Sequence, residues 1–188
     1  MGKNKGKFIT VANKKIFVID EGDFKETIVI LHGYPTSSYD YHRVLPELTK
    51  HYRVVIHDHL GFGFSDKPFS LTYSLISQAD IALQLWTAMG LKEVTILAHD
   101  YGTSVAKEIL SRKNHNLIPL KINRIILCNS SMRLEHLHIR NMDKLLKDKK
   151  LGKFIARLTN NSYQTFKKRI NTTYNPALND IDFDLNNI

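Results

Sequence analysis

The sequence predicts an α/β fold built on a doubly wound, mostly parallel β-sheet. Short apolar runs rich in β-branched residues alternate with segments in which apolar residues recur at helical spacing. Parallel strands are covered on both faces and therefore read as continuous apolar runs. Such runs lie at residues 28–31, 53–58, 94–98 and 122–128.

The first two predicted strands each end in a loop of distinctive composition. Residues 28–31 lead into His32–Pro35, and residues 53–58 lead into the glycine-punctuated segment His59–Pro68. Open α/β sheets bind ligands at the carboxyl ends of their strands, so both loops are candidate site elements. The following segment, 74–89, has the apolar periodicity of a helix and ends before a glycine.

The junction after the third predicted strand is the most informative part of the chain. The run 94–97 meets the amphipathic segment 105–110 through Ala98–Gly102, a small-x-acid-x-small pattern. This pattern is typical of a nucleophile elbow, whose sharp turn accepts only small residues two places either side of its tip. Asp100 would then be a carboxylate nucleophile that forms an alkyl ester and releases it by hydrolysis. The alternative is that Asp100 only caps the helix.

The composition is that of one globular domain. The chain has 188 residues, 43% of them hydrophobic, and no apolar run is long enough to span a bilayer. The basic segment Met1–Lys7 lacks the apolar stretch of a secretory signal. The single cysteine, Cys128, lies in a predicted strand, so we expect it to be a buried core residue and not a reactive thiol. These observations favour a cytoplasmic protein.

The chain carries a formal net charge of +9. Clusters of Lys and Arg at 147–150 and 167–169 would suit a nucleic acid or an anionic surface. They also fit solvated helix faces, and no nucleic-acid motif accompanies them. We therefore expect no nucleic-acid and no membrane partner. A basic nucleic-acid or anionic-surface binder is kept as a third functional hypothesis.

Three motifs, in matching order and spacing, resemble those of the α/β-hydrolase superfamily and, within it, the epoxide hydrolase and haloalkane dehalogenase branch. They are the loop His32–Tyr41, the loop Asp58–Pro68 and the elbow His99–Gly102. The stretch Leu145–Asp148 also matches the cap of one member. The resemblance implies a hydrolase core over residues 1–134 and the start of a helical cap over 135–176. The Asn/Asp-rich composition of the end of the chain predicts a frayed tail over 177–188.

The resemblance implies a role for each matching residue. Asp100 would attack an sp³ carbon of a small epoxide or alkyl halide, and a histidine would activate the water that hydrolyses the ester. The backbone amides of Tyr34 and Tyr101 would form the oxyanion hole, with His32 and Gly33 in the supporting loop. No cofactor is implied.

The resemblance also points to residues that would shape the site. Pro35 suggests a fixed cis turn that holds the preceding amide in place. In the cap-like region, Tyr163 and Tyr174 are candidate substrate-binding residues that would protonate the opening epoxide, although either could serve only for packing.

The pair His57 and His59 around Asp58 invites a metal-binding interpretation, because alternate residues of a strand share a face. No further ligand pattern accompanies the pair. We therefore expect no metal, and we assign Asp58 to the organisation of the glycine loop.

The sequence departs from the pattern of this branch beside the nucleophile. Dehalogenases of the branch carry Asn after the His-Gly pair and Trp after the Asp, and these side chains clamp the halide. Tyr34 and Tyr101 occupy the two positions here. This difference favours an epoxide over an alkyl halide as the substrate.

A second departure concerns the catalytic acid and base. Asn129 occupies the acid position of one subgroup, and no histidine follows His138. His136 and His138 are not at the position of the family's base. We therefore expect an incomplete hydrolase that lacks strands seven and eight, exposes the edge at Ile125–Leu127 and requires a complementary C-terminal fragment. The alternative is a catalytically dead or binding-only relative.

Overall fold

The computed structural model describes residues 3–129, all of which belong to one compact unit. Three strands come first, and helices and strands alternate after them. The strands are β1 (Lys7–Val11), β2 (Lys14–Glu21), β3 (Thr27–Leu31), β4 (Arg53–His57), β5 (Glu93–His99) and β6 (Lys121–Cys128). The helices are α1 (Leu45–Leu48), α2 (Leu75–Ala88) and α3 (Tyr101–Asn114), with short 3₁₀ turns at Lys3–Lys5 and Ser38–Tyr41.

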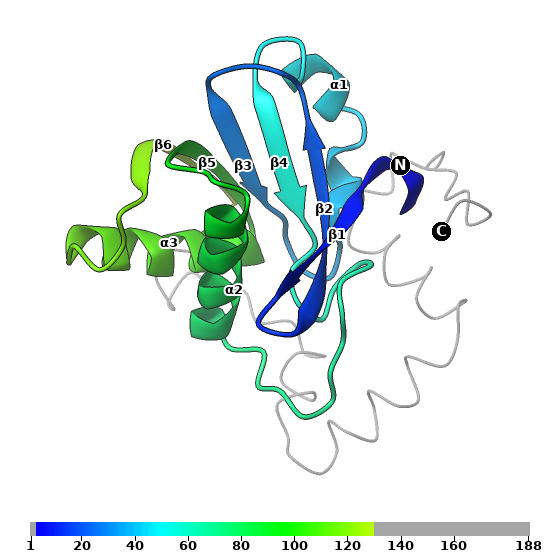
Figure 1. Ribbon diagram of the computed structural model, residues 1–188, viewed down its shortest axis with the longest axis vertical. Helices are drawn as coiled ribbons and strands as arrows, with labels where there is room; N and C mark the ends of the chain where they lie inside the picture. Colours follow the sequence, from blue (N-terminus) through cyan, green and yellow to red (C-terminus); the bar gives the residue numbers. More distant parts are fainter. Residues whose placement is uncertain (1–2, 130–188) are drawn as a thin grey trace. The chain divides into compact units, whose positions relative to one another are not determined.

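The strands form one six-stranded sheet in the order β1-β2-β4-β3-β5-β6 (Figure 1). Strand β3 pairs in parallel with β4 and β5, and β5 pairs in parallel with β6. The hairpin β1–β2 joins antiparallel to β4. The predicted mostly parallel sheet is thus confirmed. The sequence analysis did not predict the hairpin, although β2 contains the buried apolar run Ile16–Ile19.

Alternate residues of β3 bury their side chains on opposite faces of the sheet. Val29 and Leu31 belong to an apolar cluster that also contains residues of α2 and α3, such as Trp86. Ile28 and Ile30 belong to a second cluster with Leu45 of α1. Coverage on both faces explains why the β3 sequence is apolar throughout.

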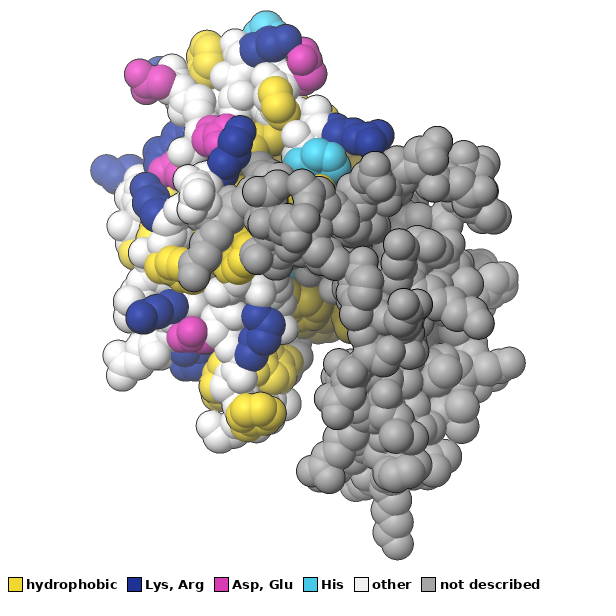
Figure 2. All heavy atoms as spheres, turned by 90° about the vertical axis from the view of Figure 1, so that its right-hand side faces the viewer, with side chains coloured by type: hydrophobic (Ala, Val, Ile, Leu, Met, Phe, Trp, Pro, Cys, Tyr) yellow, Lys and Arg dark blue, Asp and Glu magenta, His cyan; other side chains and the backbone are white. Residues whose placement is uncertain are grey.

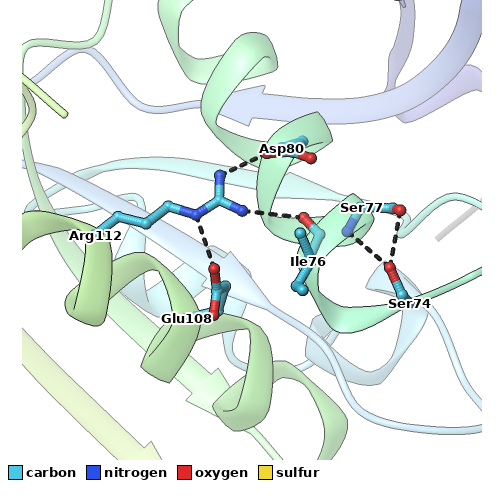
Figure 3. A network of polar contacts seen from close by, with 6 residues as sticks. All are labelled: Ser74, Ile76, Ser77, Asp80, Glu108 and Arg112. Atoms are coloured by element: carbon cyan, nitrogen blue, oxygen red, sulfur yellow. Dashed lines mark hydrogen bonds and ion pairs between the residues drawn. The ribbon is translucent and has the colours of Figure 1, made fainter. Parts of the chain in front are cut away.

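Helices α2 and α3 pack side by side and are joined by a network of polar contacts (Figure 3). Arg112 of α3 donates to Glu108 on its own helix, at 2.9 Å, and to Asp80 of α2, at 2.5 Å. Ser74 caps α2 by accepting a hydrogen bond from the Ser77 amide at 3.1 Å. The predicted helix 74–89 is therefore confirmed.

Strand β6 lies at the edge of the sheet and, within residues 3–129, pairs only with β5. Ile126 is 48% exposed, in agreement with the apolar edge predicted at 125–127. The prediction that Cys128 is a buried core residue is wrong, because its side chain is exposed at the end of this edge strand. Among the described residues, no helix has the length and apolarity needed to cross a membrane.

Candidate active site

The turn between β5 and α3 places Asp100 in a conformation that L-residues rarely adopt. Its φ and ψ angles are +48° and −114°. The Asp100 amide donates to the Cys128 carbonyl at 3.1 Å, and the Asp100 carbonyl accepts from the Thr103 amide at 3.0 Å. Such strain costs about 1–3 kcal/mol and persists only where the surroundings enforce it. These bonds to β6 and to the first turn of α3 hold the elbow in place.

The elbow approaches the loop after β3 so closely that both contact points must be glycine. A Cβ atom on Gly102 would lie 2.2 Å from the Leu31 carbonyl oxygen. A Cβ atom on Gly33 would lie 3.0 Å from the Asp100 Cβ and 2.9 Å from His99 Nδ1. The predicted need for a small residue at position 102 is therefore confirmed.

The Asp100 carboxylate makes no capping bond to the helix that follows. Instead, its Oδ1 accepts a hydrogen bond from the Tyr34 amide at 2.9 Å. The residue is otherwise exposed. The alternative that Asp100 serves as a side-chain helix cap is therefore not supported.

The structure brings one predicted oxyanion donor, the Tyr34 amide, directly to the carboxylate. The Tyr34–Pro35 peptide bond is cis, as the sequence suggested. Tyr101 is the first residue of α3, where backbone N–H groups have no acceptor inside the helix. Its role as a second donor stays a prediction.

His32 holds the loop that carries Tyr34. Its ring is fully buried, with Nδ1 2.8 Å from the Gly33 carbonyl and Nε2 2.9 Å from the His59 amide. The first contact needs a donor and the second an acceptor, so the ring is a neutral tautomer with its proton on Nδ1. Burial also lowers the pKa of His32 below its usual value. His32 therefore positions the loop and does not supply a base.

Asp58 organises the glycine loop, as predicted. It is fully buried, and its two carboxylate oxygens accept hydrogen bonds from the Ser38 amide at 2.7 Å and the Phe64 amide at 2.8 Å. The Ser65 hydroxyl donates to the Asp58 carbonyl at 2.6 Å. One buried carboxylate thus ties the loop after β3 to the loop after β4.

His57 and His59 lie in the protein interior with ring centroids 5.1 Å apart. Burial lowers the pKa of His57 to about 3 and the pKa of His59 well below its usual value. Both rings are therefore neutral near pH 7. Within residues 3–129, no three His, Cys, Asp or Glu side chains are grouped so that they could hold a metal ion.

A contact between His99 and Asn129 was not foreseen from the sequence. The Asn129 side-chain amide nitrogen lies 3.1 Å from His99 Nε2, across the ends of β5 and β6. In the sequence, His99 belongs to the elbow motif and Asn129 stands at the acid position of one subgroup. Their proximity follows only from the pairing of the two parallel strands.

The side chain of Tyr101, unlike that of Asp100, packs among aromatic rings. Its ring lies 5.6 Å from that of His59 and 5.7 Å from that of Phe62. The remaining residues singled out in the sequence, Tyr163, Tyr174, His136 and His138, lie outside the described residues.

Comparison with known proteins places these features in a family. Residues 26–180 match the model of the family described as alpha/beta hydrolase fold. LipZ of Mycobacterium tuberculosis is 37% identical over 172 residues, which are 92% of this chain and 58% of that protein. The mesoderm-specific transcript protein of Mus musculus is 37% identical over 182 residues, which cover 93% of this chain and 54% of that protein. The chain spans about half the length of these curated relatives.

A solved structure agrees with this assignment. The haloalkane dehalogenase DatA from Agrobacterium tumefaciens C58 superimposes with a TM-score of 0.58 at 28% sequence identity. The match covers 65% of this chain and 40% of the dehalogenase chain. The chain therefore resembles hydrolases of the dehalogenase-like type in both sequence and fold.

Proposed function

Since this chain belongs to the α/β hydrolase fold family, we propose that Asp100 is the nucleophile of an epoxide hydrolase-like reaction. The observation that carries the proposal is the strained elbow, which holds an exposed carboxylate against the Tyr34 amide. A capping or structural aspartate would have its oxygens bound to its own helix or buried among donors. Asp100 has neither arrangement.

The first chemical step uses the carboxylate oxygen that Tyr34 does not bind. As Asp100 Oδ2 forms a bond to an epoxide carbon, the ring C–O bond breaks and the resulting alkoxide takes up a proton. Tyr163 and Tyr174 remain the candidate proton donors. The product of this step is an alkyl ester on Asp100.

The second step is hydrolysis of that ester. Water adds to the carboxyl carbon, and negative charge then develops on Asp100 Oδ1. The Tyr34 amide already lies 2.9 Å from this atom, so the donor is in place before the charge appears. Removing one donor of this kind typically costs about 3 kcal/mol of barrier.

The residues beside the carboxylate favour an epoxide over an alkyl halide. A halide leaving group needs N–H donors that point toward it. The dehalogenases that this chain resembles supply these donors from Asn and Trp side chains. This chain has Tyr34 and Tyr101 at those positions.

Ester hydrolysis also needs a base, and the described residues give Asp100 no histidine partner. His32, His57 and His59 are buried and neutral, and His99 contacts Asn129. We therefore propose that the described unit supplies the nucleophile and the Tyr34 donor, and that both the proton donor for ring opening and the base for release of the ester come from outside residues 3–129.

Intact-mass spectrometry after incubation with a small terminal epoxide tests the proposal. The wild-type chain should gain the mass of one epoxide, and Asp100→Asn should not. Asp23→Asn is the matched control, because Asp23 is also exposed but lies in the turn between β2 and β3. This control should form the adduct as the wild type does.

Two results would contradict the proposal: an unmodified wild-type chain, or an adduct that Asp100→Asn still forms. The first result would favour the second candidate, a binding-only relative of the hydrolases. The specific observation behind that candidate is Asn129, an amide that stands where one subgroup has its acid and that contacts His99.

A further inference from the structure

The loop between β4 and α2 exposes large apolar side chains within one short segment. They are Phe69, Leu71, Tyr73, Leu75 and Ile76. Phe69 is fully exposed and Ile76 is 59% exposed. We name residues 69–76 the apolar loop. Scattered exposed apolar residues are ordinary, but a contiguous group marks a surface that meets a partner.

The apolar loop is held in shape by hydrogen bonds at its base. The Tyr73 hydroxyl donates to the Pro68 carbonyl at 2.6 Å and so closes the segment behind Phe69. The Gly61 amide donates to the Asp66 carbonyl at 2.9 Å just before it. Residues 69–73 are nevertheless all exposed. The base is therefore ordered while the tip projects into solvent, at the lower end of the coloured ribbon in Figure 1.

The other end of the apolar loop is anchored through α2. Ser74 caps this helix, and Arg112 of α3 reaches across to the Ile76 carbonyl at 3.4 Å and to Asp80 (Figure 3). The Leu75 and Ile76 side chains therefore stand on a fixed first turn. A rigid apolar surface loses little conformational freedom when it binds.

Lysines flank the apolar loop on the side of the β1–β2 turn. The Lys15 amide donates to the Asp66 carboxylate at 2.7 Å, and the Asp66 amide donates to the Lys15 carbonyl at 3.0 Å. These two bonds bring Lys14 and Lys15 beside Lys67, which precedes the loop. In Figure 2, hydrophobic side chains gather at the lower end of the described part, with Lys or Arg side chains just above them.

The acidic side chains near the apolar loop are fewer than its lysines. Asp66 accepts from the Lys15 amide and is one carboxylate beside three lysines, whereas Asp80 is paired with Arg112. The whole chain also carries a net charge of +9. The surface around the apolar loop is therefore suited to a negatively charged partner.

We propose that the apolar loop docks this chain onto an anionic lipid bilayer. A projecting tip of a few apolar residues is too small for a stable protein interface, which buries roughly 800 Å² on each partner. A bilayer accepts such a tip, because aromatic and aliphatic side chains enter the interface while lysines meet the acidic headgroups.

This proposal revises the expectation of no membrane partner. That expectation came from the lack of a bilayer-spanning run, whereas a docking loop does not need to span. The proposal also concerns residues other than the basic clusters at 147–150 and 167–169. It does not depend on the role of Asp100.

Co-sedimentation of the whole chain with lipid vesicles tests the proposal. The chain should bind vesicles of phosphatidylcholine with phosphatidylglycerol and bind pure phosphatidylcholine much more weakly. The double variant Phe69→Ser/Leu71→Ser should bind the anionic vesicles roughly tenfold or more weakly, because it removes the apolar tip. Lys15→Gln should weaken binding about fivefold.

Phe24→Ser is the matched control, since Phe24 is an exposed phenylalanine in the turn between β2 and β3. It should bind the vesicles as the wild type does. Absence of vesicle binding, or equal binding by the wild type and the double variant, would overturn the proposal. Self-association that the double variant loses, without vesicle binding, would assign the loop to a second copy of the chain instead.

Discussion

Asp58 and Asp100 follow the parallel strands β4 and β5, which flank β3, at the same edge of one sheet, yet their surroundings differ. Asp58 is fully buried, and each of its carboxylate oxygens accepts a backbone N–H bond. Asp100 is exposed, accepts one such bond and has a strained backbone. The comparison shows that donors and backbone geometry, and not residue type, separate a structural carboxylate from a candidate nucleophile.

The largest expected effect comes from removing the structural carboxylate. Asp58→Ala should lower the free energy of unfolding by about 3–6 kcal/mol, because two charge-assisted hydrogen bonds are lost and two buried N–H groups lose their acceptor. Chemical denaturation would measure the change, with Asp23→Ala as an exposed control. A loss below about 1 kcal/mol would show that Asp58 does not hold the loops together.

The second largest expected effect is a loss of folding stability in acid, because His57, which precedes Asp58, is buried. The pKa of His57 is about 3 in the folded chain and 6.5 when exposed, so the unfolded chain binds more protons between these values. Stability is therefore fully present above pH 6.5 and is lost as the pH falls. The expected loss from His57 is about 2 kcal/mol between pH 8 and pH 5.

Denaturation curves at several pH values check this expectation. His57→Phe should reduce the slope of stability against pH, and the exposed His115→Gln should leave it unchanged. The measured slope would contradict the buried, neutral state of His57 if both variants kept the wild-type value.

A smaller effect, of opposite sign, is expected at the elbow. Asp100→Gly should raise the free energy of unfolding by about 1 kcal/mol, because glycine adopts a positive φ without strain. The same variant should form no epoxide adduct. Thermal unfolding would measure the gain, and a clear loss of stability would show that the elbow is not strained.

The sequence predicted the parts of the fold that depend on local pattern. The runs that became β3, β4, β5 and β6 were visible because each is a continuous or nearly continuous apolar segment. The burial of Cys128 was predicted wrongly, because a strand sequence does not state whether the strand has a neighbour on each side. The hairpin β1–β2 was missed although β2 contains the apolar run 16–19, and its antiparallel pairing with β1 and β4 is not visible in that run.

The candidate site, like the fold, has parts that the sequence predicted and parts that it did not. Asp100 and Gly102 were predicted from the short elbow motif and Gly33 from the loop motif, although the steric contacts of both glycines are with residues far away in the sequence. The contacts of His32 with His59 and of His99 with Asn129 were not predicted, since each joins residues from different loops or strands. Such contacts depend on which strands become neighbours, and a single sequence does not reveal that.

Carboxyl labelling of the native chain, with a carbodiimide and an amine, tests the contrast between the two aspartates most directly. Peptide mapping should find Asp100 modified about as fast as the exposed Asp23, and Asp58 unmodified until the chain unfolds. Protection of Asp100, or labelling of Asp58 at the same rate, would contradict the assignment of one carboxylate to chemistry and the other to structure.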